Sequence, residues 1–218
     1  MTALDSRVIG IGSCFAHRFS SPGTLQYSLS PLPSALTTGA DRASSYSVTV
    51  SADRNDRPPR QYVTVRQANG RLVASPARLE ITAGDIVVWS ADRTVPFGFR
   101  VRGTIGSNVL DSAALVTESI YTHAFGLAGS FEWADANGSD LRGQVTVAMP
   151  DAAEGHERWL ARIGEGALVH VRGVSAEPAD LQIVVGQTVV WAVEDAPGVT
   201  ITDASLIGIG GSAASAGR

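Results

Sequence analysis

The chain lacks lysine altogether, so its 17 basic residues are all arginine. This absence excludes Schiff-base and other amine chemistry by a lysine side chain. Cysteine occurs once, at Cys14, which excludes an intrachain disulfide and any metal site built from several cysteines. No stretch approaches the roughly 20 apolar residues of a membrane-spanning helix, so no transmembrane segment is expected.

Charge is also sparse, at 17% of residues, and the net charge is −4. The arginines between Arg54 and Arg102 make that stretch locally basic without forming a single run. Nucleic-acid-binding proteins usually have a basic face and a positive balance, so no nucleic-acid partner is expected. No basic segment followed by an apolar one opens the chain at Met1 to Arg7, so the cytoplasm or the periphery of a membrane complex is favoured, and a mature chain whose leader has been removed stays open as the alternative.

What is abundant is short apolar runs bounded by turn residues. Apolar residues make up 44% of the 218-residue chain, enough to build one large or two smaller cores. The runs alternate with the period of strands, and no βαβ pattern is visible, so the sequence predicts a soluble all-β protein. The predicted strands are 46–50, 62–66, 79–89, 97–101, 119–125, 130–134, 144–148, 168–172 and 181–193.

One segment has helical spacing instead. Trp159, Leu160 and Ile163 share a face between Ala152 and Gly164, and the glycine is a typical helix end. We predict a linker helix over 151–164, packed against a neighbouring sheet or bound to a partner.

The chain also resembles itself at two constant offsets. At an offset of 106, Leu4-Asp5-Ser6 matches Leu110-Asp111-Ser112, and His17 matches His123. At an offset of 102, residues 76–89 match 178–191 at Pro, Leu, Ile, Gly and Val-Val-Trp. This self-similarity predicts two structural copies of one unit.

Residues 61–150 contain both parts of the repeated unit without interruption. We therefore predict one domain over 61–150 and a second, permuted domain formed by 1–50 plus 165–218. A half-unit alone would leave strand edges unpaired. The alternatives are head-to-tail exchange of halves between chains, which would build filaments, and a fragment of a longer repeat protein.

Three stretches resemble the cupredoxin, or plastocyanin-like, family. Residues 75–89 are similar to its opening pattern, with a proline, an apolar strand, Gly84-Asp85 and Val87-Val88-Trp89. Residues 121–133 are similar to the hairpin that leads into the family's copper loop, and 141–147 to its closing strand. The resemblance implies two Greek-key β-sandwiches over nearly the whole chain.

The same resemblance implies a copper site, whose ligands are a thiolate, two imidazoles and an axial methionine. This sequence has Ala134 and Ser28 where the cysteine is expected, and Leu141 where the methionine is expected. The early histidine has no counterpart in 94–98 or 196–199, and the late one has none in 135–140. We therefore expect no metal and no cofactor.

The remaining chemical side chains are interpreted as structural. His17 and His123 lie two residues before a phenylalanine at matched positions, and Cys14 matches Ile120, so buried and inert roles are expected. Asp5 and Asp111, each followed by serine, predict a repeated turn. We predict no catalytic residue and no enzymatic activity. The remaining groups assigned surface or solvated roles are His156, His170 and the carboxylate pairs Glu154/Glu157 and Asp135/Asp140.

These expectations describe a non-catalytic structural or docking protein. By analogy with cupredoxin-like domains, it would be an accessory subunit of a larger assembly, such as a respiratory or photosynthetic membrane complex. It would contact protein partners through loops 28–45, 51–60, 92–97 and 135–142. The first alternative is a filament or surface-layer protein. The second is a small-ligand or carbohydrate-binding module using Phe97, Tyr27, Trp133, Trp159 or Trp191.

Overall fold

The computed structural model describes residues 3–32, 45–53, 59–151 and 155–207. Nearly all of its regular structure is β, as predicted. The strands are β1 (Ser13–Arg18), β2 (Gly23–Pro31), β3 (Tyr46–Ser51), β4 (Arg60–Ala68), β5 (Arg71–Ser75), β6 (Arg78–Thr82), β7 (Ile86–Ala91), β8 (Phe99–Ile105), β9 (Asn108–Asp111), β10 (Ser119–Ala124), β11 (Gly129–Asp135), β12 (Arg142–Ala148), β13 (Ala167–Arg172), β14 (Ser175–Glu177), β15 (Asp180–Val184), β16 (Thr188–Asp195) and β17 (Ile201–Asp203).

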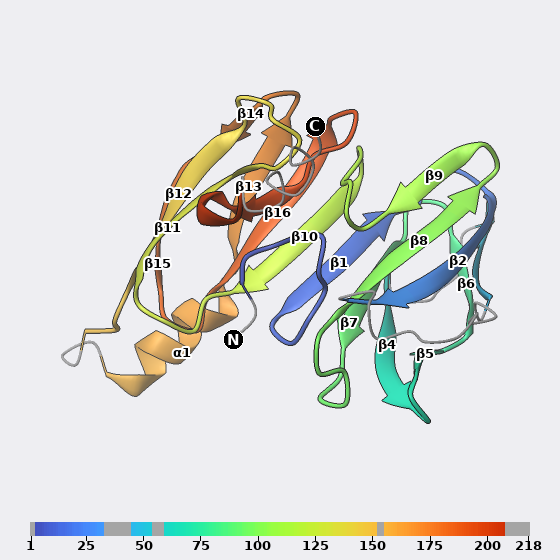
Figure 1. Cartoon of the computed structure of the whole chain (residues 1–218), viewed down its shortest axis with the longest axis horizontal. Coiled ribbons are helices and arrows are strands. Elements are labelled where there is room, and N and C mark those ends of the chain that lie inside the picture. The colour runs from blue at the N-terminus through green and yellow to red at the C-terminus, as the bar shows by residue number, and fades with distance from the viewer. Residues whose placement is uncertain (1–2, 33–44, 54–58, 152–154, 208–218) are drawn as a thin grey trace, which may run out of the picture.

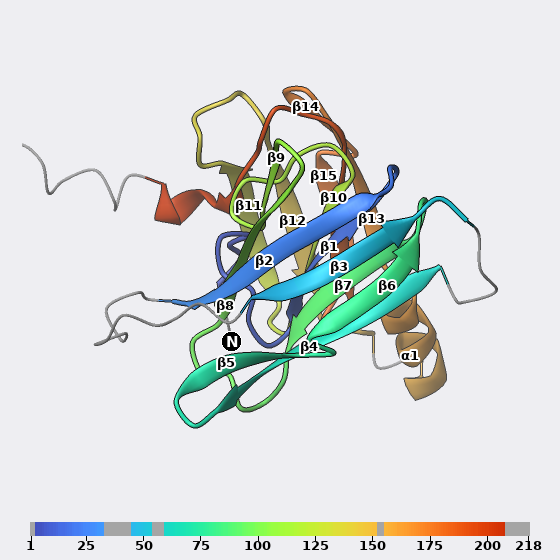
Figure 2. The same ribbon diagram turned by 90° about the vertical axis from the view of Figure 1, so that its right-hand side faces the viewer.

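The strands form three sheets that make two sandwiches lying side by side (Figure 1). An eight-stranded sheet, in the order β14-β13-β16-β10-β1-β7-β4-β5, runs through both sandwiches. Its β1-β7-β4-β5 part is covered by the five-stranded sheet β6-β3-β2-β8-β9, which faces the viewer in Figure 2. Its other part is covered by the four-stranded sheet β15-β12-β11-β17.

Strand pairing differs from the predicted division into 61–150 and 1–50 plus 165–218. The early strands β2 and β3 pair with β8 and β6, and the later β11 and β12 pair with β17 and β15. Each sandwich is thus built from consecutive strands, β1–β9 and β10–β17. Closing these shorter loops costs less chain entropy than joining the two chain ends, and neighbouring segments usually pack together.

The sequence offsets are equally compatible with this arrangement, because the same two blocks recur in the same order along the chain. Every strand between 13 and 51 has its partners within this chain. No half-sandwich is therefore left open among the described residues, and the observation that motivated exchange between chains is removed.

We call residues 1–111 the N-terminal half and 112–218 the C-terminal half. The seam between them is the antiparallel pair β1 and β10, in which Phe15 lies opposite Tyr121. These two residues are matched by the sequence offset of 106, so the register places each strand opposite its own counterpart. The two halves are consequently related by an approximate two-fold axis at this pair (Figure 1).

The leading segment of each half crosses to the other one. The Ser6 hydroxyl oxygen accepts a hydrogen bond from the Ile201 N–H at 3.1 Å, in the C-terminal sandwich. Reciprocally, the Ser112 hydroxyl accepts from the Val101 N–H at 3.0 Å, in the N-terminal sandwich. These buried bonds lock the halves together at both ends of the seam.

Large aromatic side chains fill both cores at matched positions. In the N-terminal half Trp89 packs on Phe15 and Tyr27, with ring centroids 5.5 and 5.7 Å apart. In the C-terminal half Trp191 packs on Tyr121 and Trp133 at 5.8 and 5.9 Å. The core placement expected for Trp89 and Trp191 is confirmed, since both are fully buried.

Close backbone approach requires glycine at one place in each sandwich. A Cβ on Gly143 would lie 2.0 Å from the carbonyl oxygen of Ala179, and one on Gly103 would lie 2.3 Å from that of Gln26. Both contacts are far inside van der Waals distance. The glycines therefore allow strands β12 and β8 to pack against their neighbours.

The predicted helix is present as α1 (His156–Gly164), followed later in the chain by the short 3-10 helix η2 (Ala204–Leu206). It connects β12 to β13 inside the C-terminal sandwich, so it does not link two domains. The Trp159 indole N–H donates to the Val185 carbonyl at 3.0 Å, and Ile163 packs over Gly186. Among the described residues, no helix is long and apolar enough to cross a membrane.

Candidate functional site

The positions that the cupredoxin resemblance assigns to copper ligands hold no strong copper donor. Ala134 lies on β11, and Leu141, at the expected methionine position, is buried in the core. On β2 the Ser28 hydroxyl points to the Arg102 carbonyl at 3.5 Å. In the loop before β8, Phe97 is 58% exposed.

The loop after β11 is closed by its own hydrogen bonds. The buried Asp135 carboxylate accepts from the N–H of Thr200 at 2.8 Å and from the Ser139 hydroxyl at 2.8 Å. The Asn137 side-chain amide donates to the Gly198 carbonyl at 3.3 Å. Because an alanine and a leucine stand where the thiolate and the thioether are needed, and the loop 135–140 holds no histidine, these residues do not fit copper.

No group of three or more metal-ligating side chains occurs within the ranges that the structure describes. Of the carboxylates expected to be solvated, Asp135 is instead buried as the acceptor that closes its loop, whereas Asp140 is exposed as expected. Glu157 lies exposed on α1, while Glu154 falls outside the described residues. Asp135 and Asp140 therefore form no acid-base pair, because Asp135 is hydrogen-bonded within its own loop and Asp140 points to solvent.

The two matched histidines are packed as expected. Each ring stands edge-on to the phenylalanine two residues later: His17 on Phe19 at 5.0 Å and His123 on Phe125 at 4.9 Å. The His17 Nδ1 lies 3.3 Å from the Ser119 hydroxyl oxygen. Burial lowers the pKa of both histidines to about 4, because the charged imidazolium loses its hydration.

The other candidates have the following positions. Cys14 is half-buried on the outer face of β1, and burial raises the pKa of its thiol, consistent with an inert side chain. Asp5 and Asp111 form the predicted turns, accepting from the N–H two residues later at 2.9 and 3.0 Å. Asp111 also pairs with Arg100.

The aromatic residues considered for ligand binding are mostly core. Tyr27, Trp133 and Trp191 are buried, and Trp159 is held against the sheet by its indole hydrogen bond. Phe97 alone among these is strongly exposed. Of the loops predicted to contact partners, 92–97 and 135–142 are described in full, whereas residues 33–44 and 54–58 lie outside the described ranges.

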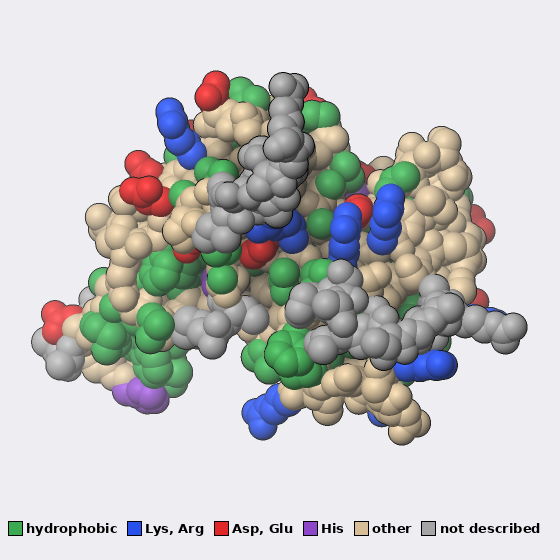
Figure 3. Space-filling model, viewed as in Figure 1, with side chains coloured by type: hydrophobic (Ala, Val, Ile, Leu, Met, Phe, Trp, Pro, Cys, Tyr) green, Lys and Arg blue, Asp and Glu red, His purple; other side chains and the backbone are tan. Residues whose placement is uncertain are grey.

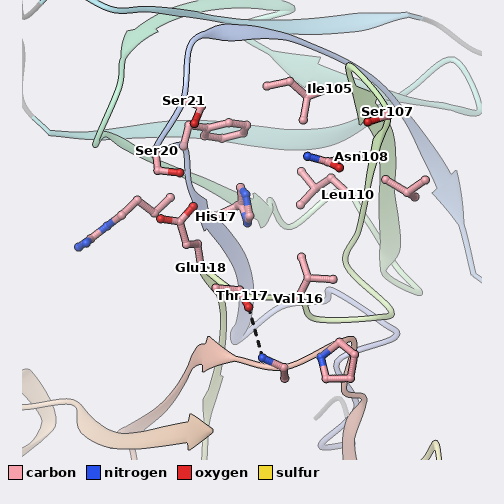
Figure 4. A pocket seen from close by; sticks show the side chains of 15 residues that line it. His17, Ser20, Ser21, Ile105, Ser107, Asn108, Leu110, Val116, Thr117 and Glu118 are labelled. Carbon is pink, nitrogen blue, oxygen red and sulfur yellow. Dashed lines mark hydrogen bonds between the residues drawn. The ribbon is translucent and has the colours of Figure 1, made fainter. Parts of the chain in front are cut away.

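A hollow lies where the two halves meet, at one end of the seam. This cleft has a volume of about 500 Å³. Figure 4 shows His17, Ser20 and Glu118 on one wall, facing Ile105, Asn108 and Leu110 on the other. The remaining lining residues are Arg18, Phe19, Ser21, Ser107, Val109, Val116, Thr117, Ala196 and Pro197.

Glu118 has a backbone conformation that side-chain-bearing residues rarely adopt, with φ at 71°. Its counterpart at the offset of 106 is Gly12, whose φ is 88°. A left-handed conformation costs a non-glycine residue roughly 1–2 kcal/mol, so glycine is the favourable choice at both positions. The C-terminal half nevertheless has a glutamate there, at the edge of the cleft, and such strain is concentrated at functional sites.

Sequence reasoning assigned no role to Glu118 or Arg18. The signal was present in the self-alignment, where a glutamate faces a glycine across an otherwise similar block. Only the positive φ of Glu118 shows that the glutamate occupies a conformation that favours glycine.

Comparison with family models, with curated proteins and with solved structures finds no match for this chain. The site is therefore interpreted from its own residues.

Proposed function

We propose that this chain is a non-catalytic, copper-free structural or docking protein, built from two copies of a cupredoxin-like unit. The observation that supports it best is the set of side chains at the expected ligand positions. Ala134, Ser28 and Leu141 cannot supply the thiolate and thioether of a blue copper centre. The two-copy interpretation rests on the constant sequence offsets and on the matched aromatic contacts of Trp89 and Trp191.

The shared eight-stranded sheet supports a scaffold role. A seam of main-chain hydrogen bonds and two crossing segments hold the sandwiches in one orientation, so loops at both ends keep fixed positions relative to one another. Such a body presents loops 92–97 and 135–142 to a partner without prior ordering, which lowers the entropic cost of binding. We propose that it docks as an accessory subunit of a larger assembly, such as a respiratory or photosynthetic membrane complex.

Copper titration tests the first part of this proposal. The purified chain is expected to give no stoichiometric copper binding and no intense blue absorbance under reducing or oxidising conditions. As the control, a variant carrying Ala134→Cys, Asn137→His and Leu141→Met restores donors to the loop after β11. A blue centre in the unmodified chain would overturn the copper-free assignment.

Light scattering over a range of concentrations tests the second part. A mass near 22.7 kDa at all concentrations is expected for a docking subunit with closed sandwiches. Species that grow with concentration would favour the filament alternative instead, since an open head-to-tail contact does not close.

A further inference from the structure

The two halves of the molecule carry opposite charge. Residues 1–111 hold 12 arginines and 8 acidic residues, a net charge of +4, whereas residues 112–218 hold 5 arginines and 13 acidic residues, a net charge of −8. In the face shown in Figure 3, most arginines lie over the N-terminal half. The summed field therefore changes sign along the long axis of the molecule, near the seam.

The inter-half cleft lies at this boundary. One wall comes from the end of β1 and the β8–β9 hairpin, both in the N-terminal half. The loop before β10 and the loop after β16, from the C-terminal half, complete it. A ligand in the cleft would thus contact a basic half and an acidic half at once.

Arg18 and Glu118 meet at the boundary through their backbones. The Arg18 N–H donates to the Glu118 carbonyl oxygen at 3.0 Å, so the two side chains start from adjacent positions on opposite halves. Both line the cleft of about 500 Å³ and also a second hollow of about 330 Å³ on the outer face of the sheet. Neither side chain forms an ion pair with a residue that the structure describes.

We propose that the cleft binds a small zwitterion, an α-amino acid with an apolar side chain. Its carboxylate would pair with the Arg18 guanidinium and its ammonium with the Glu118 carboxylate, in the direction set by the charges of the two halves. A glycine would hold this backbone without strain, so we assign the function of this position to the glutamate side chain. This inference does not depend on the docking role proposed above.

The rest of the cleft fits the apolar side chain. Phe19, Ile105, Leu110 and Val116 supply aliphatic and aromatic surface along its walls. His17 adds an imidazole that burial keeps neutral, so it contributes no competing charge. The lining is about half apolar and half polar, and apolar walls combined with a few placed polar or charged groups are the usual form of a small-molecule site.

The test is isothermal titration at pH 7 and low ionic strength with three ligands of similar shape. L-leucine carries both charges, isocaproate lacks the ammonium, and isoamylamine lacks the carboxylate. L-leucine is expected to bind with one site per chain, and each analogue at least tenfold more weakly. No binding of L-leucine, or equal binding of either analogue, would overturn the proposal.

Variants separate the site from the general field of the molecule. Glu118→Gly introduces the residue found at Gly12, so the fold is expected to be as stable as before while leucine affinity falls at least tenfold. Arg18→Gln should weaken binding similarly. Glu132→Gln, on exposed β11, removes the same charge away from the cleft and should leave affinity unchanged. Full leucine affinity in the Glu118→Gly protein would refute the assignment.

Discussion

Acid should destabilise this protein well above the pH at which its carboxylates are protonated, because of His17 and His123. Burial lowers the pKa of each imidazole from 6.5 to about 4. As the pH falls from 6.5 towards 4, these two histidines therefore bind protons in the unfolded chain but stay unprotonated in the folded chain. The free energy of unfolding must decrease over this window.

The magnitude follows from the pKa difference, at 1.36 kcal/mol per unit. Between pH 7 and pH 5 each histidine removes about 2 kcal/mol of stability, and both remove about 4 kcal/mol. Of the two contributions to this loss of stability, that of His17 is the smaller, because its ring is partly exposed to solvent at the cleft whereas His123 is buried. A loss of this size is a large fraction of a typical domain's stability of about 5–15 kcal/mol.

Urea unfolding followed by tryptophan fluorescence measures the effect, since Trp89, Trp133 and Trp191 are all buried in the folded protein. The double variant His17→Gln, His123→Gln should have nearly the same midpoint at pH 7 and pH 5, and each single variant should recover about half of the loss. If the double variant lost as much stability as the parent, the acid sensitivity would have another source and the reasoning would fail.

Two further substitutions test the seam and the strand packing. Tyr121→Phe removes the buried hydroxyl that accepts from the Asp5 N–H at 3.3 Å, and should cost about 1 kcal/mol in urea unfolding; an unchanged midpoint would mean that this bond contributes nothing. Gly143→Ala places a Cβ 2.0 Å from the carbonyl oxygen of Ala179, so we expect the free energy of unfolding to fall by several kcal/mol and the melting temperature to fall with it. Gly164→Ala, where the added carbon meets open space, should leave the melting temperature unchanged.

Much of the fold could be predicted from the sequence, because strand formation depends on local alternation. The runs at 46–50, 119–125 and 144–148 are strands with nearly the predicted bounds. Short strands such as β14, of three residues, were missed because so few residues show no periodicity, and the longer β1 and β2 were not among the predicted strands either. The predicted runs 79–89 and 181–193 are each two strands, which lie in different sheets. The turns at Asp5 and Asp111 were predicted correctly, since an aspartate and the N–H two residues later suffice to form them.

The pairing of the halves and the candidate site depended on tertiary structure. The offsets of 102 and 106 establish that two blocks of sequence recur in alternation along the chain. Each block could form a sandwich with the block before it or with the block after it, so the sequence does not determine which blocks pair. Likewise, Glu118 and Arg18 are 100 positions apart and meet only because β1 and β10 pair at the seam. Sequence by itself determined the all-β class, many of the strands and the burial of Trp89 and Trp191. The tertiary structure alone decided the seam, the cleft and the strained glutamate, since these arise from long-range backbone hydrogen bonds that no local pattern encodes.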